Sequence, residues 1–325
     1  VLHSGLFHKM LSKGVPPTFV FILMNWYTDL RCTVLWNGNF SRSFSIKCGV
    51  RQGGILSPYL FSFYIDDLVN QLRISGYGIY MNAIFAGCIL YADDILLLSC
   101  SYYGLQQLVN VCARYGKEWD IHFNQLKCQC ITFGDRTLDY VDILLNDMSI
   151  QWVSKMKYLG IYFISGTCRI DLTAAIGKFH GNFNNIVSVL GTKRDEVSAI
   201  HLIKSYCLPI LTYACETWSS DMFDCHKLNV TWNNCFRKVF NCCWRESTAS
   251  LQYYCNALPL SFLIEQMRLL FLRKLLYCNN QLLRMLATLA YHEYLAIAAK
   301  YNIHISMDKY QVKQLIWQTF AHGVA

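Results

Sequence analysis

Two adjacent acidic side chains, Asp93 and Asp94, are the residues whose setting most suggests chemistry. They lie between two short runs rich in isoleucine and leucine, in the stretch IFAGCILYADDILLLS at residues 84–99. Short apolar runs on either side of a polar break predict a buried β-hairpin with the acids at its tip. A carboxylate beside a core strand is costly unless something compensates its charge, so we expect this pair to bind a divalent cation.

A second stretch, residues 49–72, joins a glycine-containing loop to a predicted helix. The backbone at Gln52, Gly53 and Gly54 can approach a ligand closely, because glycine has no Cβ. Ser57 followed by Pro58 is typical of a helix start, with the serine as the cap. A glycine turn before a capped helix is a common structural feature, so these residues alone favour an ordinary turn over a ligand-binding loop.

Another acidic pair, Asp66 and Asp67, lies within that predicted helix. Neighbouring residues on a helix point about 100° apart, so they do not converge on one ion as residues at a hairpin tip can. We therefore interpret Asp66 and Asp67 as surface or structural residues and not as a metal site.

Three motifs in order give the chain a family resemblance. Residues 91–94 read Y-A-D-D, the Y-x-D-D box of reverse transcriptases, and residues 51–58 match the box R-Q-G-x-x-L-S-P. Residues 158–160 match the Y-L-G signature of the same enzymes. From residue 1 to about residue 163 the chain resembles the reverse transcriptases of LINE-type (non-LTR) retrotransposons.

The resemblance implies a set of site residues and partners. It implies Asp93, Asp94 and Lys127 as catalytic residues, Arg51, Gln52, Gly53, Ser57, Tyr91 and Asn124 as nucleotide or template contacts, and Tyr158, Leu159 and Gly160 on the primer side. Asp93 and Asp94 would hold Mg²⁺, for which Mn²⁺ can substitute. Lys127 would protonate the leaving pyrophosphate or offset its charge. The implied partners are an RNA template, a DNA primer and deoxynucleoside triphosphates. Without the resemblance, Asn124 would be interpreted as a turn residue and Lys127 as a surface lysine.

The resemblance also implies an α+β fold. Residues 1–165 would form part of a right-hand polymerase palm, an antiparallel sheet with helices on one face, and residues 166–325 an all-helical thumb and C-terminal region. The fingers would be missing. Apolar spacing predicts helices over residues 2–13, 18–30, 57–72, 105–119, 171–190, 195–217, 224–243, 260–278, 281–300 and 308–321. Hairpins are expected to turn at Asn37-Gly38 and, between residues 143 and 163, at Asn146-Asp147.

Composition sets broader limits. The chain has 325 residues, 54% of them hydrophobic, which suffices for a large core and two domains. Its net charge of +8 suits a polyanionic partner. No run reaches the roughly 18 uninterrupted apolar residues of a membrane span, and no signal peptide is recognised, so we expect an intracellular protein of the nucleus or cytoplasm.

The 16 cysteines show no C-x-x-C spacing. We expect reduced, mostly buried thiols in place of disulfides. The loose group of Cys225, His226, Cys235, Cys242 and Cys243 has an irregular spacing that disfavours a zinc site.

One expected element of the active site is missing from the sequence. Val1-Leu2-His3 resembles the end of a reverse transcriptase phrase, F-x-D-x-x-x-A-F-D-x-V-x-H, whose catalytic aspartate would fall about two residues before Val1. Two hard cations need carboxylates from more than one strand. We therefore expect this chain to be an inactive fragment of an RNA-directed DNA polymerase.

Alternative functions remain open at the level of sequence. The chain could be a non-catalytic, nucleic-acid-binding remnant of a polymerase palm, which the missing aspartate favours. It could also be a group II intron or retron type of reverse transcriptase, although no maturase region is recognised. A small polytopic membrane protein is suggested only by the apolar composition.

Overall fold

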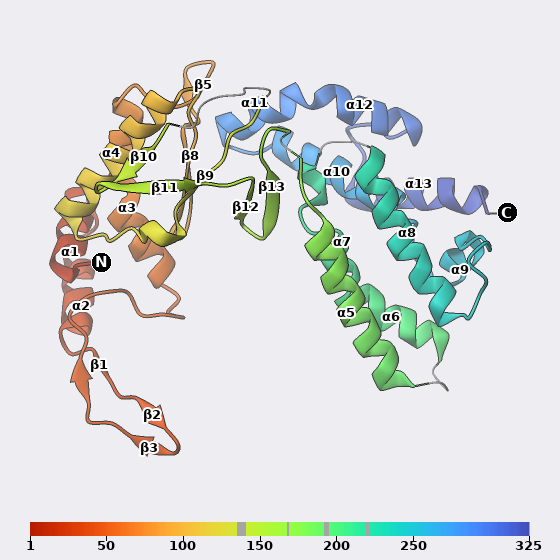
Figure 1. The fold of residues 1–325 in the computed structure, drawn as a ribbon, viewed down its shortest axis with the longest axis horizontal. Coiled ribbons are helices and arrows are strands. Elements are labelled where there is room, and N and C mark those ends of the chain that lie inside the picture. The colour runs from red at the N-terminus through yellow and green to blue at the C-terminus, as the bar shows by residue number, and fades with distance from the viewer. Residues whose placement is uncertain (135–140, 168, 192–194, 219–221, 325) are drawn as a thin grey trace. The chain divides into compact units, whose positions relative to one another are not determined.

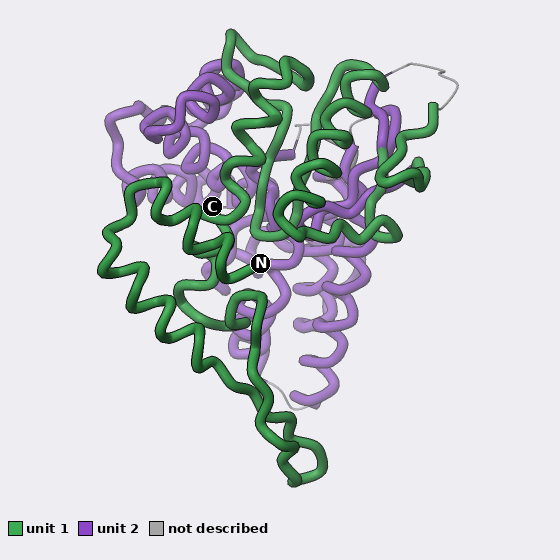
Figure 2. Tube along the Cα trace, turned by 90° about the vertical axis from the view of Figure 1, so that its left-hand side faces the viewer, with its two compact units in different colours: residues 1–130, 137–153 green, residues 131–136, 154–325 purple. Residues whose placement is uncertain are grey.

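Helices and short strands are mixed along the chain, as predicted for an α+β fold. The computed structural model describes residues 1–134, 141–167, 169–191, 195–218 and 222–324 (Figure 1). The chain divides into two compact units (Figure 2). Unit 1 comprises Val1–Cys130 and Thr137–Val153, and unit 2 comprises Ile131–Arg136 and Ser154–Ala325. The expected division into palm and thumb at residue 165 stays a prediction.

Unit 1 contains the four helices expected in the first half of the chain. They are α1 (His3–Ser12), α2 (Pro17–Thr28), α3 (Ser57–Ile74) and α4 (Tyr102–Trp119). Gly14 follows α1 with a φ of +78°, which glycine adopts without strain, and Pro17 opens α2. The Ser101 side chain caps α4 by accepting a hydrogen bond from the Gly104 amide.

The strands of unit 1 are short and pair mainly with their neighbours in sequence. They are β1 (Arg31–Cys32), β2 (Leu35–Trp36), β3 (Asn39–Phe40), β4 (Phe44–Ser45), β5 (Tyr80–Met81), β6 (Ile84–Phe85), β7 (Cys88–Tyr91), β8 (Asp94–Leu97), β9 (Gln129–Cys130), β10 (Ile143–Leu145) and β11 (Met148–Trp152). The expected turns are confirmed, because Asn37-Gly38 joins β2 to β3 and Asn146-Asp147 joins β10 to β11, all four residues at positive φ.

The expected continuous antiparallel sheet is not what the described residues form. Most strands make separate two-stranded ladders, and β11 pairs in parallel with β9. A tight turn is enough to close each local hairpin. Strands of two to five residues offer few backbone groups for wider pairing, which explains the division into small sheets.

Helices α3 and α4 form the layer against which the β7–β8 hairpin packs. The two helices share a buried apolar cluster, which consists of Ile65, Leu68 and Leu72 of α3 and Leu108, Val111, Cys112 and Tyr115 of α4. The hairpin packs against this cluster through Cys88, Leu90, Ile95 and Leu97. The opposite face of β7 is open, since Ile89 is 44% exposed. The prediction of a buried hairpin is therefore wrong for one face, because helices cover only the other.

A buried lysine joins α1 to this layer. Lys9 is only 1% exposed, and its Nζ lies 3.0 Å from an Asp67 carboxylate oxygen and 2.7 Å from the Tyr64 carbonyl oxygen. The ammonium group also donates to the Tyr115 hydroxyl and lies 3.6 Å from the centre of the Trp119 ring. Burial lowers the pKa of Lys9, whereas Asp67 acts in the opposite direction.

Unit 2 begins with one hairpin and continues as helices. Strands β12 (Lys155–Tyr158) and β13 (Ile161–Ile164) precede α5 (Thr173–Leu190), α6 (Glu196–Tyr206), α7 (Leu208–Leu211), α8 (Met222–Val239), α9 (Ala249–Tyr254), α10 (Leu260–Leu276), α11 (Gln281–Leu289), α12 (Tyr291–Lys300) and α13 (Lys309–His322). The helical character expected here is confirmed.

Two predicted helices of unit 2 are divided, and one was not predicted. The helix expected over 195–217 breaks between α6 and α7, where Pro209 lacks the amide that a continuous helix needs. The helix expected over 281–300 breaks at Ala290, where neither proline nor glycine marks the change. Helix α9 spans six residues, too few to show a helical period in the sequence.

The segment 143–163 forms two hairpins, although one was predicted. The first is β10–β11, and the second is β12–β13, in which Tyr158 pairs with Ile161. The second turn consists of Leu159 and Gly160, with φ values of +46° and +84°. Leucine rarely adopts a positive φ, so the sequence did not suggest a tight turn there.

An ion pair fixes the start of α5 to β12 and makes the stability of unit 2 depend on pH. Asp171 accepts a hydrogen bond from Lys155 Nζ, and its other oxygen lies 2.8 Å from the Thr173 amide nitrogen. The Lys155 and Thr173 hydrogen bonds lower the pKa of Asp171 to about 2. The unfolded chain then binds more protons between about pH 4 and pH 2, so stability falls as pH falls through this range.

We expect this protonation to cost ~1 kcal/mol, because the partly exposed Lys155 is screened by water. Urea unfolding at pH 5 and at about pH 2 checks it, with Asp171→Asn as the comparison. The wild type should lose more stability than the variant between the two pH values. An equal loss in both proteins would contradict the ion pair.

The described cysteines are all free thiols, as expected. The prediction that most are buried is only partly correct, because Cys32, Cys48, Cys100 and Cys243 are exposed and several others are half-buried. Burial raises the pKa of Cys88 to about 11 and that of Cys112 to about 12. Cys168 lies outside the described residues.

Among the described helices, no single one is both long and apolar enough to cross a bilayer. The bent pair Glu196–Tyr206 and Leu208–Thr217 meets the criteria of length and composition only when its two parts are taken together.

Candidate active site

The acidic pair lies at the tip of the β7–β8 hairpin, as predicted. Tyr91 pairs with Asp94 across the ladder, so Ala92 and Asp93 form the two-residue turn. Ala92 has a φ of +52°, a conformation that costs an L-residue roughly 1 kcal/mol. Strain of this kind persists where the surroundings impose it, and it is frequent at functional sites.

Both carboxylates of the tip face water. Tyr91, Ala92, Asp93 and Asp94 are all exposed, and within the described chain neither aspartate has a hydrogen-bond or ion-pair partner. Two uncompensated carboxylates offer hard oxygen ligands, which Mg²⁺ prefers. In the described ranges no group of three or more His, Cys, Asp or Glu residues could hold a metal ion. Among the described residues, the tip therefore offers two acidic ligands and no third.

The glycine loop is tied to the start of α3 through one carbonyl group. The Arg51 carbonyl oxygen accepts hydrogen bonds from the Gly54 amide, at 3.0 Å, and from the Ser57 hydroxyl. Gly53 has a φ of +75°, which glycine adopts easily. Ser57 is the first residue of α3 and its hydroxyl donates to the loop, so the prediction that it caps the helix is wrong. The Arg51 and Gln52 side chains are exposed.

Helix α3 connects this loop with the acidic turn, by which we mean the tip of the β7–β8 hairpin with Asp93 and Asp94. The loop precedes its first residue, Ser57, while its buried residues Ile65 and Leu68 belong to the cluster on which β7 and β8 pack. The loop and the acidic turn are thus attached to the same helix within unit 1. No hydrogen bond or ion pair links the loop directly to the turn in the described residues.

The remaining predicted site residues lie in two different units. Asn124 immediately precedes a short 3-10 helix, Gln125–Lys127, of which Lys127 is the last residue, and both side chains are exposed. The helix is held to β10 by a 2.9 Å hydrogen bond from Gln125 to the Leu145 carbonyl oxygen.

Tyr158, Leu159 and Gly160 belong to unit 2, so their position relative to Asp93 stays a prediction. Within unit 2 the Tyr213 hydroxyl donates to the Leu159 carbonyl oxygen at 2.9 Å. A Cβ added at Gly160 would lie 3.3 Å from the Tyr213 ring.

The second acidic pair has a structural role, as expected. Asp66 lies 2.6 Å from Lys13 Nζ, and Asp67 lies 3.0 Å from Lys9 Nζ and 3.2 Å from Lys13 Nζ. Burial raises the pKa of Asp67, but hydrogen bonds from Lys9 and Lys13 outweigh it and the net pKa is lowered. Both acids are therefore compensated by lysines at or just after the end of α1, which distinguishes them from Asp93 and Asp94.

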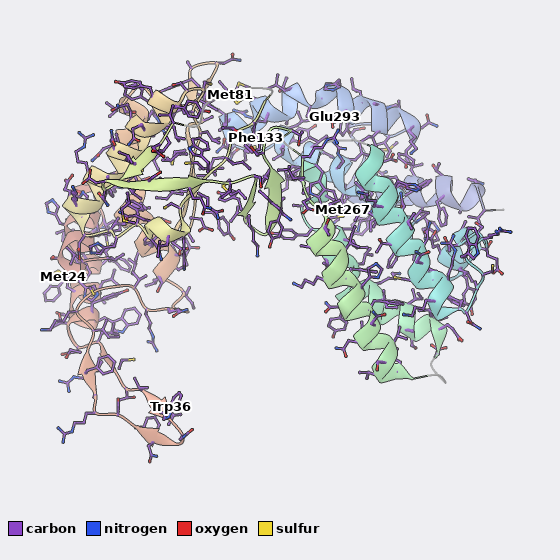
Figure 3. The ribbon with its side chains drawn as sticks, viewed as in Figure 1. Met24, Trp36, Met81, Phe133, Met267 and Glu293 are labelled. Carbon is purple, nitrogen blue, oxygen red and sulfur yellow. The ribbon has the colours of Figure 1, made fainter. Side chains whose placement is uncertain are left out.

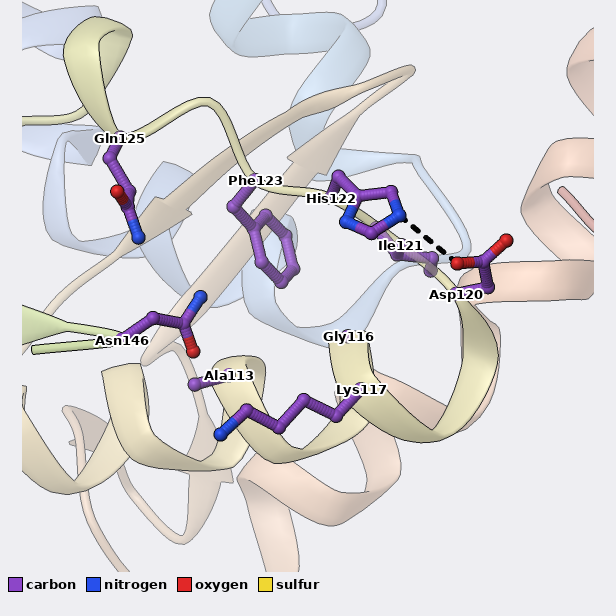
Figure 4. A pocket seen from close by; sticks show the side chains of 9 residues that line it. All are labelled: Ala113, Gly116, Lys117, Asp120, Ile121, His122, Phe123, Gln125 and Asn146. Atoms are coloured by element: carbon purple, nitrogen blue, oxygen red, sulfur yellow. Dashed lines mark ion pairs between the residues drawn. The ribbon is translucent and has the colours of Figure 1, made fainter.

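A shallow cavity of about 290 Å³ lies elsewhere in unit 1 (Figure 4). It is lined by Ala113, Gly116, Lys117, Asp120, Ile121, His122, Phe123, Gln125 and Asn146. The Nε2 atom of His122 lies 3.0 Å from a carboxylate oxygen of Asp120. None of the predicted site residues lines this cavity. The hairpin tip with Asp93 and Asp94 is an exposed surface feature outside this cavity.

Comparison with known proteins confirms the family resemblance. The family model for reverse transcriptase (RNA-dependent DNA polymerase) matches residues 1–163, half of the chain. The chain is 26% identical over 266 residues to the RNA-directed DNA polymerase from mobile element jockey of Drosophila funebris, covering 78% of this chain and 28% of that protein.

Two further relatives come from other retrotransposons. A probable RNA-directed DNA polymerase from transposon BS of Drosophila melanogaster is 27% identical over 256 residues, covering 74% of this chain and 28% of that protein. The Pol polyprotein of element R2DM from the same species is 25% identical over 185 residues, covering 54% and 17%. The chain thus spans less than a third of the length of these relatives. On the match over residues 1–163, the chain belongs to the reverse transcriptase family, with relatives in LINE-type, non-LTR retrotransposons.

Proposed function

We propose that residues 1–163 carry the nucleotidyl-transfer site of an RNA-directed DNA polymerase from a LINE-type retrotransposon. One observation carries the proposal: in a chain of this family, two carboxylates that have no partner among the described residues lie at the exposed tip of a hairpin that packs on the helix holding the glycine loop. Template, primer and substrates would be RNA, DNA and deoxynucleoside triphosphates.

In the proposed site, Asp93 and Asp94 hold divalent cations, Mg²⁺ or its substitute Mn²⁺. The donor set supports this assignment, because both side chains are exposed, acidic and free of competing partners within the described residues. Bound cations would neutralise the charge that develops on the phosphates during transfer. Complete coordination of two ions needs at least one further carboxylate, which the described residues do not bring to the turn.

The other proposed roles follow the motifs. Arg51, Gln52 and Gly53, with Ser57 behind them, would orient the incoming nucleotide and the templating base. Tyr91 would contact the same nucleotide from the hairpin. Asn124 and Lys127 would lie beside the triphosphate, with the lysine offsetting the charge of the departing pyrophosphate.

Tyr158, Leu159 and Gly160 would support the primer strand. Helices α5–α13 would form the thumb and the C-terminal region, following a partial palm over residues 1–165. The exposed basic side chains of the helical part and the net charge of +8 support contact with a nucleic-acid backbone.

The described residues bring no third acidic ligand to the hairpin tip, which favours a second candidate function, a nucleic-acid-binding remnant without catalysis. The two functions differ in primer extension. We expect the chain alone to bind RNA but to extend a primer only at background, because the described residues bring only two acidic ligands to the hairpin tip.

The test is a hybrid polymerase, in which residues 1–163 replace the matching segment of the jockey polymerase from Drosophila funebris. The same jockey protein lacking that segment is the negative control. Extension of a DNA primer on an RNA template with Mg²⁺ by the hybrid supports the catalytic proposal. RNA binding without extension would contradict it and favour the remnant.

A further inference from the structure

A two-stranded arm, residues 31–47, extends from the end of α2 in both views of unit 1 (Figures 1 and 2). Strands β2 and β3 form its outer part, and β1 and β4 its base. Leu35 pairs with Phe40, whereas Cys32 pairs with Phe44, so the returning strand contains one extra residue between the two ladders. Such a bulge bends and twists a ribbon without ending it.

Neither face of the arm is covered. Every residue from 31 to 45 is exposed, and the large side chains include Trp36, 76% exposed, and Phe40, 74% exposed. The register puts these two rings on opposite faces of the ribbon, since Trp36 pairs with Asn39 and Leu35 with Phe40. Figure 3 shows Trp36 close to the tip. Exposed aromatic residues at this density mark an interaction surface.

Charge identifies the partner of the arm. Residues 30–65 contain Arg31, Arg42, Lys47 and Arg51 and no aspartate or glutamate. In the described chain, none of the three basic side chains of the arm forms an ion pair or a side-chain hydrogen bond. By contrast, Lys9 of α1 and Lys13, which follows the end of α1, are paired with Asp66 and Asp67. The arm therefore offers uncompensated positive charge next to exposed rings.

We propose that the arm binds single-stranded RNA, with Trp36 and Phe40 stacking on bases and Arg31, Arg42 and Lys47 contacting phosphates. Stacking on aromatic rings with nearby cations is the general means of gripping single strands, because every base has a flat face. Paired bases in a duplex are already stacked, so the rings favour a single strand. The inference rests on the proposed function only in making this strand the template.

The experiment measures binding of the whole chain to a fluorescently labelled oligouridylate of about 16 nucleotides, by anisotropy, as a function of salt. The double variant Trp36→Ala/Phe40→Ala should bind about tenfold more weakly, whereas Trp36→Phe should keep most of the affinity. Tyr310→Ala, which removes a ring 81% exposed on α13, is the matched control and should leave affinity unchanged.

Two further readouts separate stacking from charge. Arg42→Gln should lower the slope of the logarithm of affinity against the logarithm of salt concentration by about 0.7, the value for one phosphate contact on a single strand. The double aromatic variant should weaken binding of an RNA–DNA duplex much less than binding of the single strand. Circular dichroism should show an unchanged fold, because the substituted side chains are exposed.

Unchanged affinity of the double aromatic variant for the single strand would overturn the proposal. The same applies if that variant loses self-association in sedimentation equilibrium while RNA affinity stays constant, since the arm would then bind a second copy. Failure of the hybrid polymerase to extend primers leaves this measurement intact, so the two proposals can fail separately.

Discussion

Replacing Asp93 by asparagine in the hybrid polymerase is expected to lower primer extension about a thousandfold, equivalent to ~4 kcal/mol of transition-state stabilisation. Asparagine keeps the size of the side chain and one oxygen, so the hairpin should keep its structure while losing a charged ligand. Asp93 forms part of the turn and has no described partner that the substitution would disturb. The measurement is the rate of single-nucleotide addition at saturating Mg²⁺.

Asp66→Asn is the matched control for this experiment. Asp66 also belongs to an adjacent acidic pair, but its side chain is 60% exposed and contacts Lys13, which follows the end of α1. We expect its removal to change the rate less than twofold, because it lies outside the proposed metal site. Comparable losses in Asp93→Asn and Asp66→Asn would refute the assignment of the metal ligands.

Substitution of Lys9 by alanine is expected to destabilise unit 1 by about 3 kcal/mol. The change would leave the Asp67 carboxylate, the Tyr64 carbonyl oxygen and the Tyr115 hydroxyl without their shared donor. It would also open a cavity beside the Trp119 ring. Hydrogen exchange of the α3 and α4 amides measures this effect in unit 1 separately from unit 2.

Two comparisons isolate the cause of the Lys9 effect. Lys13→Ala removes a more exposed lysine directly after the same helix and should cost less than about 1 kcal/mol. Lys9→Met combined with Asp67→Asn should recover part of the loss, because no buried charge is then left unpaired. If Lys9→Ala and Lys13→Ala destabilise unit 1 equally, the buried ion pair contributes no more to stability than the exposed one, which would contradict the prediction.

This buried ion pair illustrates what local sequence patterns do not reveal. Lys9 lies three residues after Leu6 on the buried face of α1, and the sequence favoured only the apolar members of that face. Its partner Asp67 is 58 residues away in the chain and becomes a neighbour only when α1 packs on α3. Contacts between distant segments have no periodic signal, so residue patterns alone could not predict them.

Short-range features were predicted well, because they depend on neighbouring residues. The Asn37-Gly38 and Asn146-Asp147 turns follow from the preference of these residues for positive φ. The turn at Leu159-Gly160 was missed, because leucine rarely adopts a positive φ and so does not indicate a turn in the sequence. The bulge of the arm was also missed, because an apolar pattern does not show the register in which two strands pair. The same pattern does not show whether another layer of the protein covers the strands.

In the candidate site, too, the predictions that depend on neighbouring residues were confirmed, whereas those that depend on more distant contacts or on ligands were not. The position of Asp93 and Asp94 at a hairpin tip followed from two apolar runs and was confirmed. The hydrogen bond of Ser57 to the Arg51 carbonyl oxygen replaced the expected helix cap, because the loop returns to the helix start. The roles of Lys127 and of Tyr158 depend on nucleic acid and nucleotide, and they stay predictions.

Binding of Mn²⁺ to the isotopically labelled chain tests the metal assignment most directly, because the paramagnetic ion broadens the NMR signals of nearby amides. We predict selective broadening of the amides of Ala92, Asp93, Asp94 and Ile95, and its disappearance in the Asp93→Asn/Asp94→Asn variant. Broadening centred on Asp66 and Asp67, or broadening around the hairpin that persists in the variant, would contradict the account.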